Sequence, residues 1–204
     1  MNFEIKNKGQ KTLFRSPFLE KFTKSTPELI ALAYVPVLIA MIVYCFTGME
    51  FSLLHFAGYF FSGLFFWTFF EYLMHRYIFH FVSENPRMQK LQYTIHGVHH
   101  EYPRDKDRLL MPPVAGIIIA TLLFFLFKIL LNDNAFAFFP GFLLGYLLYG
   151  MMHYAIHAMK PPFQFLKPHW RNHSLHHYKH PNLFFGVSSP LWDYVFGTYS
   201  KIKE

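Results

Sequence analysis

The chain of 204 residues contains 13 histidines, and ten of them fall into four clusters. Polar groups beside apolar segments are costly unless they are paired, so four such clusters indicate a shared function. Imidazole nitrogens bind iron, zinc, copper and nickel, and the pattern therefore predicts a metal centre. The clusters consist of His75 and His80; His96, His99 and His100; His153 and His157; and His173, His176 and His177.

The spacing within the clusters suits two metal ions. Residues four apart project from nearly the same face of a helix, so His153 and His157 can bind the same ion. In each His-x-x-His-His cluster the first histidine lies one turn from the other two, so the cluster can present ligands toward two neighbouring ions. His75 and His80 are five residues apart, and both can be ligands only if the helix ends, unwinds or bulges between them.

The donor set alone does not name the metal, because the clusters contain no carboxylate and imidazole suits several metals. The single cysteine, Cys45, excludes an intrachain disulfide and a cysteine-based metal site. A neutral histidine shell leaves the full positive charge on the ions, which favours binding of water, oxide or a reduced form of O2 between them. We predict two iron ions and O2 as cofactors, since iron can oxidise an unactivated C–H bond and zinc cannot. Zinc found in purified protein would be a substitute on the same ligands.

Four apolar stretches are long enough to cross the hydrocarbon core of a membrane, which takes about 20 residues of helix. Hydrophobic residues make up 53% of the chain and charged residues only 15%, as expected when lipid is much of the solvent. The stretches form two close pairs whose connections are short, turn-like and free of Lys and Arg. We therefore expect an all-α integral membrane protein with four transmembrane helices in two hairpins and almost no strand. The stretches are residues 29–46, 51–74, 114–131 and 136–152.

Nearly all basic residues lie outside the two pairs, before residue 29, in 76–108 and after 159. By the positive-inside rule these segments are cytoplasmic, which places both termini and all four histidine clusters on one side. Lys128 is the exception, and it lies near a helix end where its side chain can reach the interface. The net charge of +7 fits cytoplasmic loops and anionic lipid better than nucleic acid, which we do not expect as a partner.

The expected organisation is a cytosolic N-terminal segment, 1–28, followed by one membrane catalytic domain, 29–204. In this domain the segments between and after the helical hairpins form a cytosolic helical cap that holds the dimetal site. Pro112 and Pro113 mark the boundary between this cap and the third span, because proline cannot donate the backbone hydrogen bond of an interior helical turn.

Several polar residues outside the clusters are candidates to support the metal ligands. We expect Glu71, one turn before the first cluster, to orient a ligand or to pair with a cap residue. Asp105 and Asp107 either support the site or belong to a solvated charge run. His169 and His180 are either ligand-orienting groups or ordinary surface residues.

The order and spacing of the clusters resemble the fatty acid hydroxylase and sterol desaturase superfamily. Two segments, HGVHHEYPRDKDRLLMPP at 96–113 and FGVSSPLWDYVFGT at 185–198, look like its fatty acid 2-hydroxylase branch, and the similarity extends from residue 51 onward. The resemblance implies a four-helix transmembrane base with a cytosolic cap and a dimetal centre bound by the ten histidines. It also implies O2-dependent hydroxylation of a fatty acyl chain at the 2-position, in a free fatty acid or in the N-acyl chain of a sphingolipid.

The chain departs from the family pattern at its N-terminal segment. Many eukaryotic members carry a b-type cytochrome domain there, and residues 1–28 are too few for one and lack its haem-binding histidine motif. We therefore expect a separate electron-transfer protein, of cytochrome b5-like or ferredoxin type, to supply the electrons. A chain of this kind suits the bacterial inner membrane as well as the endoplasmic reticulum.

The lipid substrate is expected to place its acyl chain in an apolar groove between the spans. Arg104, Arg108 or Arg171 is a candidate to anchor the head group so that one carbon lies over the metals. A lipid desaturase or a sterol oxidase on the same dimetal scaffold is an alternative, because desaturation begins with the same hydrogen abstraction. A histidine-rich metal transporter fits less well, since its ligands should lie near the middle of the bilayer.

Overall fold

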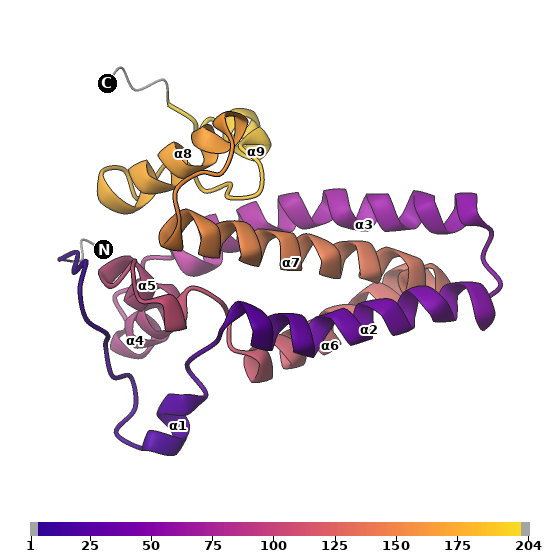
Figure 1. The fold of residues 1–204 in the computed structure, drawn as a ribbon, viewed down its shortest axis with the longest axis horizontal. Helices are drawn as coiled ribbons and strands as arrows, with labels where there is room; N and C mark the ends of the chain where they lie inside the picture. Colours follow the sequence, from indigo (N-terminus) through magenta and orange to yellow (C-terminus); the bar gives the residue numbers. More distant parts are fainter. Residues whose placement is uncertain (1–3, 201–204) are drawn as a thin grey trace.

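Four long helices form the body of the protein, and short helices cover one end of them (Figure 1). The computed structural model describes residues 4–200, and this part of the chain contains no strand, as predicted. The long helices are α2 (Pro27–Thr47), α3 (Leu53–Leu73), α6 (Pro113–Leu131) and α7 (Ala135–Ala158). The shorter ones are α1 (Pro17–Lys21), η1 (Met74–Phe79), α4 (Pro86–Gln92), η2 (Tyr93–Gly97), α5 (Val98–Glu101), η3 (Lys106–Arg108), η4 (Asn132–Asn134), η5 (Gln164–Leu166), α8 (Lys167–Tyr178) and α9 (Leu191–Val195).

Local signals fix where the long helices begin. Thr26 caps α2 by accepting a hydrogen bond from the Leu29 amide, and Ser52 caps α3 in the same way through the His55 amide. Proline occupies the first turn of α2 and of α6, where its missing N–H costs nothing. The long helices therefore start within two residues of the predicted spans, because caps and prolines are local features of the sequence.

The tightest packing in the bundle is between α3 and α7. A Cβ atom added to Gly63 would lie 2.0 Å from the carbonyl oxygen of Phe138, and one added to Gly141 would lie 1.8 Å from that of Phe60. Small residues allow membrane helices to approach this closely. Aromatic side chains fill the remaining space, with Trp67 packed against Phe142 at 5.0 Å between ring centroids.

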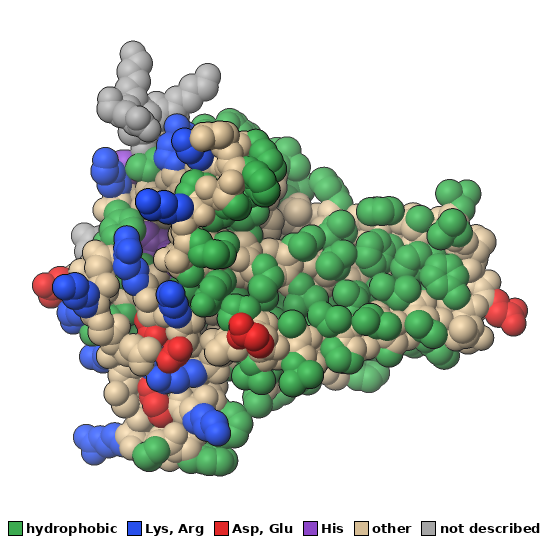
Figure 2. Space-filling view, viewed as in Figure 1, with side chains coloured by type: hydrophobic (Ala, Val, Ile, Leu, Met, Phe, Trp, Pro, Cys, Tyr) green, Lys and Arg blue, Asp and Glu red, His purple; other side chains and the backbone are tan. Residues whose placement is uncertain are grey.

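Three helical stretches in the described part of the chain are long and apolar enough to cross a membrane. They are Pro27–Thr47, Leu53–Phe79 and Lys106–Ala158, and the last of these includes both α6 and α7. Their outer surfaces are covered with hydrophobic side chains along the length of the bundle (Figure 2). The predicted all-helical fold, with helices long and apolar enough for a membrane, is thereby confirmed. One boundary differs, because α7 continues past residue 152 to Ala158, where its polar residues face inward.

The cap consists of two helical segments, α4 to η3 and α8 to α9. The N-terminal segment runs alongside the first of them (Figure 1). The backbone of Lys6 donates to Glu101 O at 2.7 Å, and that of Ser25 donates to Asp107 O at 2.8 Å. The helical segments predicted between and after the hairpins are present up to residue 200, and the prediction for 201–204 lies outside the described residues. The cap lies at the end of the bundle where the histidines gather.

Candidate metal centre

The ten clustered histidines converge into two groups of five at the junction of bundle and cap. Within each group, one ring nitrogen of every residue lies within 4.8 Å of those of the others. Each group combines side chains from distant segments, such as His75 and His176, which are 101 residues apart in the sequence, so both groups depend on the tertiary fold. The first group is His75, His80, His96, His100 and His176, and the second group is His99, His153, His157, His173 and His177.

The π-helical segment η1 (Met74–Phe79) brings His75 and His80 into the same group. A π-turn has one more residue per hydrogen-bonded ring than an α-turn, so residues five apart come onto one face. The two rings lie 5.1 Å apart between centroids. The predicted distortion of the helix at this point is therefore confirmed, and it takes the form of a bulge.

Each His-x-x-His-His cluster divides its side chains between the two groups. His96 and His100, four residues apart, belong to the first group, and His99 between them belongs to the second. In α8 the assignment is reversed: His173 and His177 belong to the second group, whereas His176 belongs to the first. Each cluster therefore has side chains in both groups, and its binding of two neighbouring ions stays a prediction. Which histidine serves which site depends on how the two helices dock.

The distances between ring nitrogens match those of ligands on a common ion. The Nε2 atoms lie 3.0 Å apart in His96 and His100 and 2.9 Å apart in His157 and His173. The Nε2 atom of His176 lies 3.0 Å from that of His80. Two nitrogens bound at right angles to one ion, each at about 2.1 Å, would be about 3.0 Å apart. The residues present therefore fit a metal ion in each group.

Several of the buried ring nitrogens have no hydrogen-bond partner in the described part of the chain. Buried polar atoms of native proteins are nearly always paired, because an unpaired one costs about 1–3 kcal/mol. A cation bound in each group would satisfy one ring nitrogen each of His75, His99, His153 and His177. The unpaired nitrogens are Nε2 of His75 and of His153, Nδ1 of His173, and both ring nitrogens of His99 and of His177.

Burial keeps the cap histidines neutral. It lowers the pKa of His80 to about 2 and that of His176 to about 3, and neighbouring imidazoles add to the effect. The same causes hold the pKa of His96, His99 and His100 well below 6.5. A neutral imidazole has a lone pair on one nitrogen, and this is the form that binds metals.

Backbone carbonyl groups fix which nitrogen of three histidines is free. Nδ1 of His75 donates to Phe185 O at 2.6 Å, and Nδ1 of His176 donates to Leu183 O at 2.7 Å. Nδ1 of His153 donates to Leu109 O at 2.9 Å. In each case Nε2 carries the lone pair and points into its group. Such hydrogen bonds orient metal ligands and raise their basicity.

The loop at 183–188 supplies two of these carbonyl groups, and two buried carboxylates hold it in place. Glu71 accepts hydrogen bonds from Val187 N at 2.7 Å and from Ser188 N at 3.0 Å. Asp193 accepts from Phe185 N and Gly186 N, both at 2.8 Å. Glu71 thus pairs with cap residues, as the sequence suggested, and acts on the histidines through this loop.

Asp193 was not expected from the sequence. Its side chain also accepts from Thr198 Oγ1 at 2.7 Å, and Thr198 in turn contacts the Tyr72 hydroxyl at 2.9 Å. Arg76 donates to the same hydroxyl at 2.7 Å. The only signal in the sequence is one acidic residue in an otherwise uncharged segment, 184–197, and that signal does not indicate its partners.

Two further histidines lie near the centre without joining either group. Nδ1 of His169 donates to Val187 O at 2.9 Å, so this residue supports the same loop. His180 lies at the turn after α8, where its backbone N–H donates to Leu175 O at 2.7 Å. His169 therefore has the geometry of a supporting residue, and His180 contributes to the turn through its backbone.

The other polar candidates contact the N-terminal segment or the cap surface. Asp105 binds Arg108 at 2.7 Å, and Asp107 binds Lys24 at 3.1 Å. Arg108 is buried and also pairs with Glu20. These groups attach the N-terminal segment to the cap.

Arg104 and Arg171 are exposed on the cap. Arg104 lines a small pocket of about 50 Å³ together with His157. Arg171 contacts the Tyr199 hydroxyl at 3.2 Å. Of these two arginines, Arg104 therefore has direct access to a pocket at the second group.

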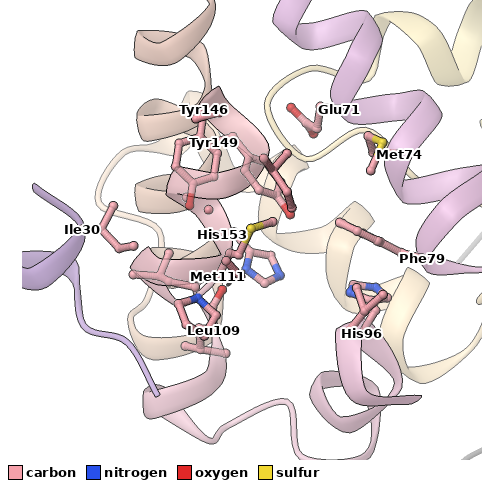
Figure 3. Close-up of a pocket in the computed structure, with 18 of the residues that line it drawn as sticks. Ile30, Glu71, Met74, Phe79, His96, Leu109, Met111, Tyr146, Tyr149 and His153 are labelled. Atoms are coloured by element: carbon pink, nitrogen blue, oxygen red, sulfur yellow. Dashed lines mark hydrogen bonds between the residues drawn. The ribbon is translucent and has the colours of Figure 1, made fainter. Parts of the chain in front are cut away.

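An apolar cavity of about 450 Å³ leads from the histidines into the bundle (Figure 3). His96, His99 and His153 line one end of it, so it reaches both groups. Along α7 its wall extends from His153 to Phe139, a rise of about 21 Å for 14 residues of helix. The predicted apolar groove between the helices is therefore present. Other wall residues include Ile30, Met74, Phe79, Leu109, Met111, Tyr146 and Tyr149.

Comparison with known proteins identifies relatives of this chain. A family model described as fatty acid hydroxylase matches residues 60–198. The ceramide very long chain fatty acid hydroxylase scs7 of Schizosaccharomyces pombe is 36% identical over 194 residues, which are 93% of this chain and 55% of that protein. The fatty acid 2-hydroxylase of Rattus norvegicus is 41% identical over 110 residues, 53% of this chain and 30% of that protein.

A solved structure shares the fold. It is described as full-length scs7p with only the hydroxylase domain visible, and it aligns with a TM-score of 0.84 at 36% identity. The alignment covers 90% of this chain and 70% of the other. The chain spans about half the length of the yeast proteins it matches, 55% and 50%.

Proposed function

This chain belongs to the fatty acid hydroxylase family, and from that premise we propose that it hydroxylates the acyl chain of a lipid at the 2-position. The relatives named above act, by their names, on ceramide or fatty acids. The cavity is the observation that carries the proposal. Its apolar wall ends at His96, His99 and His153, so an acyl chain lying in it would end at both histidine groups. The substrate is then a free fatty acid or the N-acyl chain of a sphingolipid.

The proposed cofactors are two iron ions, one held by each group of five histidines. Iron bound there would supply the O2 chemistry that removes hydrogen from an unactivated C–H bond. One turnover consumes O2, two electrons and two protons, and it yields the hydroxylated lipid and one water. The all-imidazole donor set, the free Nε2 atoms and the spacing of about 3.0 Å support this assignment. Zinc in purified protein would occupy the same ligands.

The protein residues have three tasks in this scheme. The loop at 183–188 and Leu109 O orient ligand histidines, and the apolar cavity wall holds the acyl chain and excludes water. The third task is to bind the head group. Arg108 already pairs with Glu20 and Asp105, which leaves Arg104 and Arg171 as the exposed candidates.

We further propose that α2, α3, α6 and α7 each cross the membrane, as two hairpins in a catalytic domain formed by 29–204. Residues 1–28 are then a cytosolic segment. The apolar outer surface of the bundle supports four crossings, and the basic residues gathered on the cap support its cytoplasmic location (Figure 2). The membrane would be a bacterial inner membrane or the endoplasmic reticulum.

Electrons for the reaction are proposed to come from a protein of cytochrome b5-like or ferredoxin type. The outer face of the cap is rich in exposed Lys and Arg (Figure 2), which would attract an acidic partner. Exposed basic residues of the cap include Arg87, Lys90, Arg104, Lys106, Lys160, Lys167 and Lys179.

Expression of the wild type and of His176→Ala in a lipid-producing host tests the reaction and the cofactor together. We expect 2-hydroxy acyl lipids and about two iron ions per chain for the wild type, and neither full iron content nor product for the variant. His55→Ala is the control, because His55 lies at the far end of α3, where it contacts Asn134 at 2.8 Å. Unsaturated or sterol products from the wild type, or normal product from His176→Ala, would refute the proposal.

A further inference from the structure

Five residues of the apolar cavity wall are exposed, and all five are apolar. We call these five residues the portal. They come from the turn after α1, from η1, from η2 and from α6, so they surround an opening between the bundle and the cap. The large ones are 41–46% exposed. The portal residues are Phe22, Ile78, Ile95, Ala115 and Ile119.

The surface around the portal is also apolar. On α1, Phe18 is 69% exposed, and on α4, Leu91 is 48% exposed. Neither helix buries these side chains against another element in the described part of the chain. Short helices with exposed apolar residues beside basic ones lie at the boundary between head groups and acyl chains of a bilayer. Lys21 and Lys90 are the basic neighbours on these two helices.

The portal is continuous with the lipid-facing surface of the bundle. Ile119 belongs to α6, within a stretch that is long and apolar enough to cross a membrane. Its neighbour Ile118 is 57% exposed and does not line the cavity. One side of the opening therefore faces the lipid around the bundle, and the other side is formed by the cap.

From these observations we propose that the acyl chain enters the cavity sideways through the portal, from the lipid leaflet next to the cap. The substrate is then the acyl chain of a lipid that already resides in the bilayer, and not a chain delivered by a water-soluble carrier. This inference rests on the proposed function. For that function, the portal determines from which acyl carriers the enzyme can accept a chain.

A second, smaller pocket at the centre offers a contrast. The pocket beside His157 is polar, with Arg104, Ser174 and Tyr178 in its wall, and it measures about 50 Å³ against about 450 Å³ for the cavity. A space of that size accepts a water molecule or O2 but no acyl chain. Access from the cap surface therefore suits small molecules, and access from the membrane suits the lipid.

Matched tryptophan substitutions test the portal in full-length protein reconstituted into vesicles that contain a long-chain ceramide. Ile119→Trp and Ile95→Trp should lower the rate of hydroxylation about tenfold or more, because a narrowed entrance raises the barrier to substrate entry. Ile118→Trp and Leu91→Trp change residues that are more exposed (57% and 48%, against 41% for Ile119 and 44% for Ile95) and lie off the cavity wall, and they should stay within about twofold of wild type. Iron content, measured for all four variants, should not change.

A second assay compares substrate sources and uses the same variants. Acyl-CoA supplied in water should be a poor substrate for the wild type, and what activity it supports should depend on Ile119 as the ceramide activity does. Two results would overturn the portal: equal rates for Ile119→Trp and Ile118→Trp with ceramide, or efficient use of aqueous acyl-CoA that neither substitution changes.

A readout independent of catalysis separates the portal from the proposed reaction. In a Cys45→Ala background, nitroxide labels at Ile119→Cys and Ile95→Cys should be more accessible to O2 than to a water-soluble nickel chelate. Long-chain ceramide should immobilise these labels and leave a label at Ile118→Cys unchanged. If wild type forms no hydroxylated product but the labels respond, the reaction is wrong and the portal stands. If wild type is active and the labels do not respond to ceramide, the portal is wrong.

Discussion

Replacement of Asp193 by alanine should remove one metal ion of the pair before the other. Asp193 is 1% exposed, and it accepts three hydrogen bonds of 2.7–2.8 Å from Phe185 N, Gly186 N and Thr198 Oγ1. Without it, the loop that supplies carbonyl groups to His75 and His176 loses the carboxylate that binds its Phe185 and Gly186 amides, and only Glu71 still holds it at Val187 and Ser188. Both of these histidines belong to the first group.

The size of the effect follows from the hydrogen bonds that orient the ligands. Loss of such a partner typically lowers metal affinity by about 10–100-fold, and two ligands of one ion are affected here, so a loss of about 100-fold or more is expected. The second group keeps the contact of His153 with Leu109 O at 2.9 Å. We therefore expect the iron content of Asp193→Ala to fall from about two to about one per chain during a chelator titration.

The assay is iron per chain by mass spectrometry at increasing chelator concentration. Thr198→Val, which removes one of the three hydrogen bonds, should show a smaller shift in the same direction. Asp133→Asn is the matched control, since this carboxylate is exposed and pairs with Lys128 at the other end of the bundle. Simultaneous loss of both ions, or a titration like that of wild type, would refute the reasoning.

Two further predictions concern packing and protonation. Gly141→Val should prevent assembly of the bundle, because even a Cβ there would lie 1.8 Å from Phe60 O; size-exclusion chromatography in detergent checks this, and a monodisperse variant would contradict it. Metal-free protein should lose stability as the pH falls below about 6.5, because below that pH the histidines of the unfolded chain bind protons and the buried ones of the folded chain do not. The loss should be up to about 1.4 kcal/mol per pH unit for each buried histidine. The folded pKa values of about 2 for His80 and about 3 for His176 place the lower end of this window near pH 3, and a melting temperature that stays constant or rises on acidification from pH 7 to 5 would rule the explanation out.

The parts of the fold that the sequence predicts well are those with local causes. The starts of α2 and α6 follow from Thr26 and Pro113, and the bulge between His75 and His80 follows from their spacing of five residues. The end of α7 was placed too early, because His153 and His157 interrupt the apolar pattern without ending the helix. Hydropathy cannot distinguish a helix end from a polar site on a continuing helix.

The ten candidate ligands were also found from local spacing, but their division into two groups was not. That division places His99 with His173 and His100 with His176, and it depends on how α5 and α8 approach each other. Asp193 and the loop at 183–188 were missed for a related reason. The hydrogen bond from His75 to Phe185 O joins residues 110 apart in the chain, and a sequence does not show which backbone carbonyl groups will accept such bonds.

The most direct measurement is anomalous X-ray scattering at the iron absorption edge from crystals of the purified protein. We expect two peaks per chain, one among the five histidines that include His176 and one among the five that include His157. A single peak, or peaks away from these ten side chains, would contradict a dimetal centre at the end of the apolar cavity.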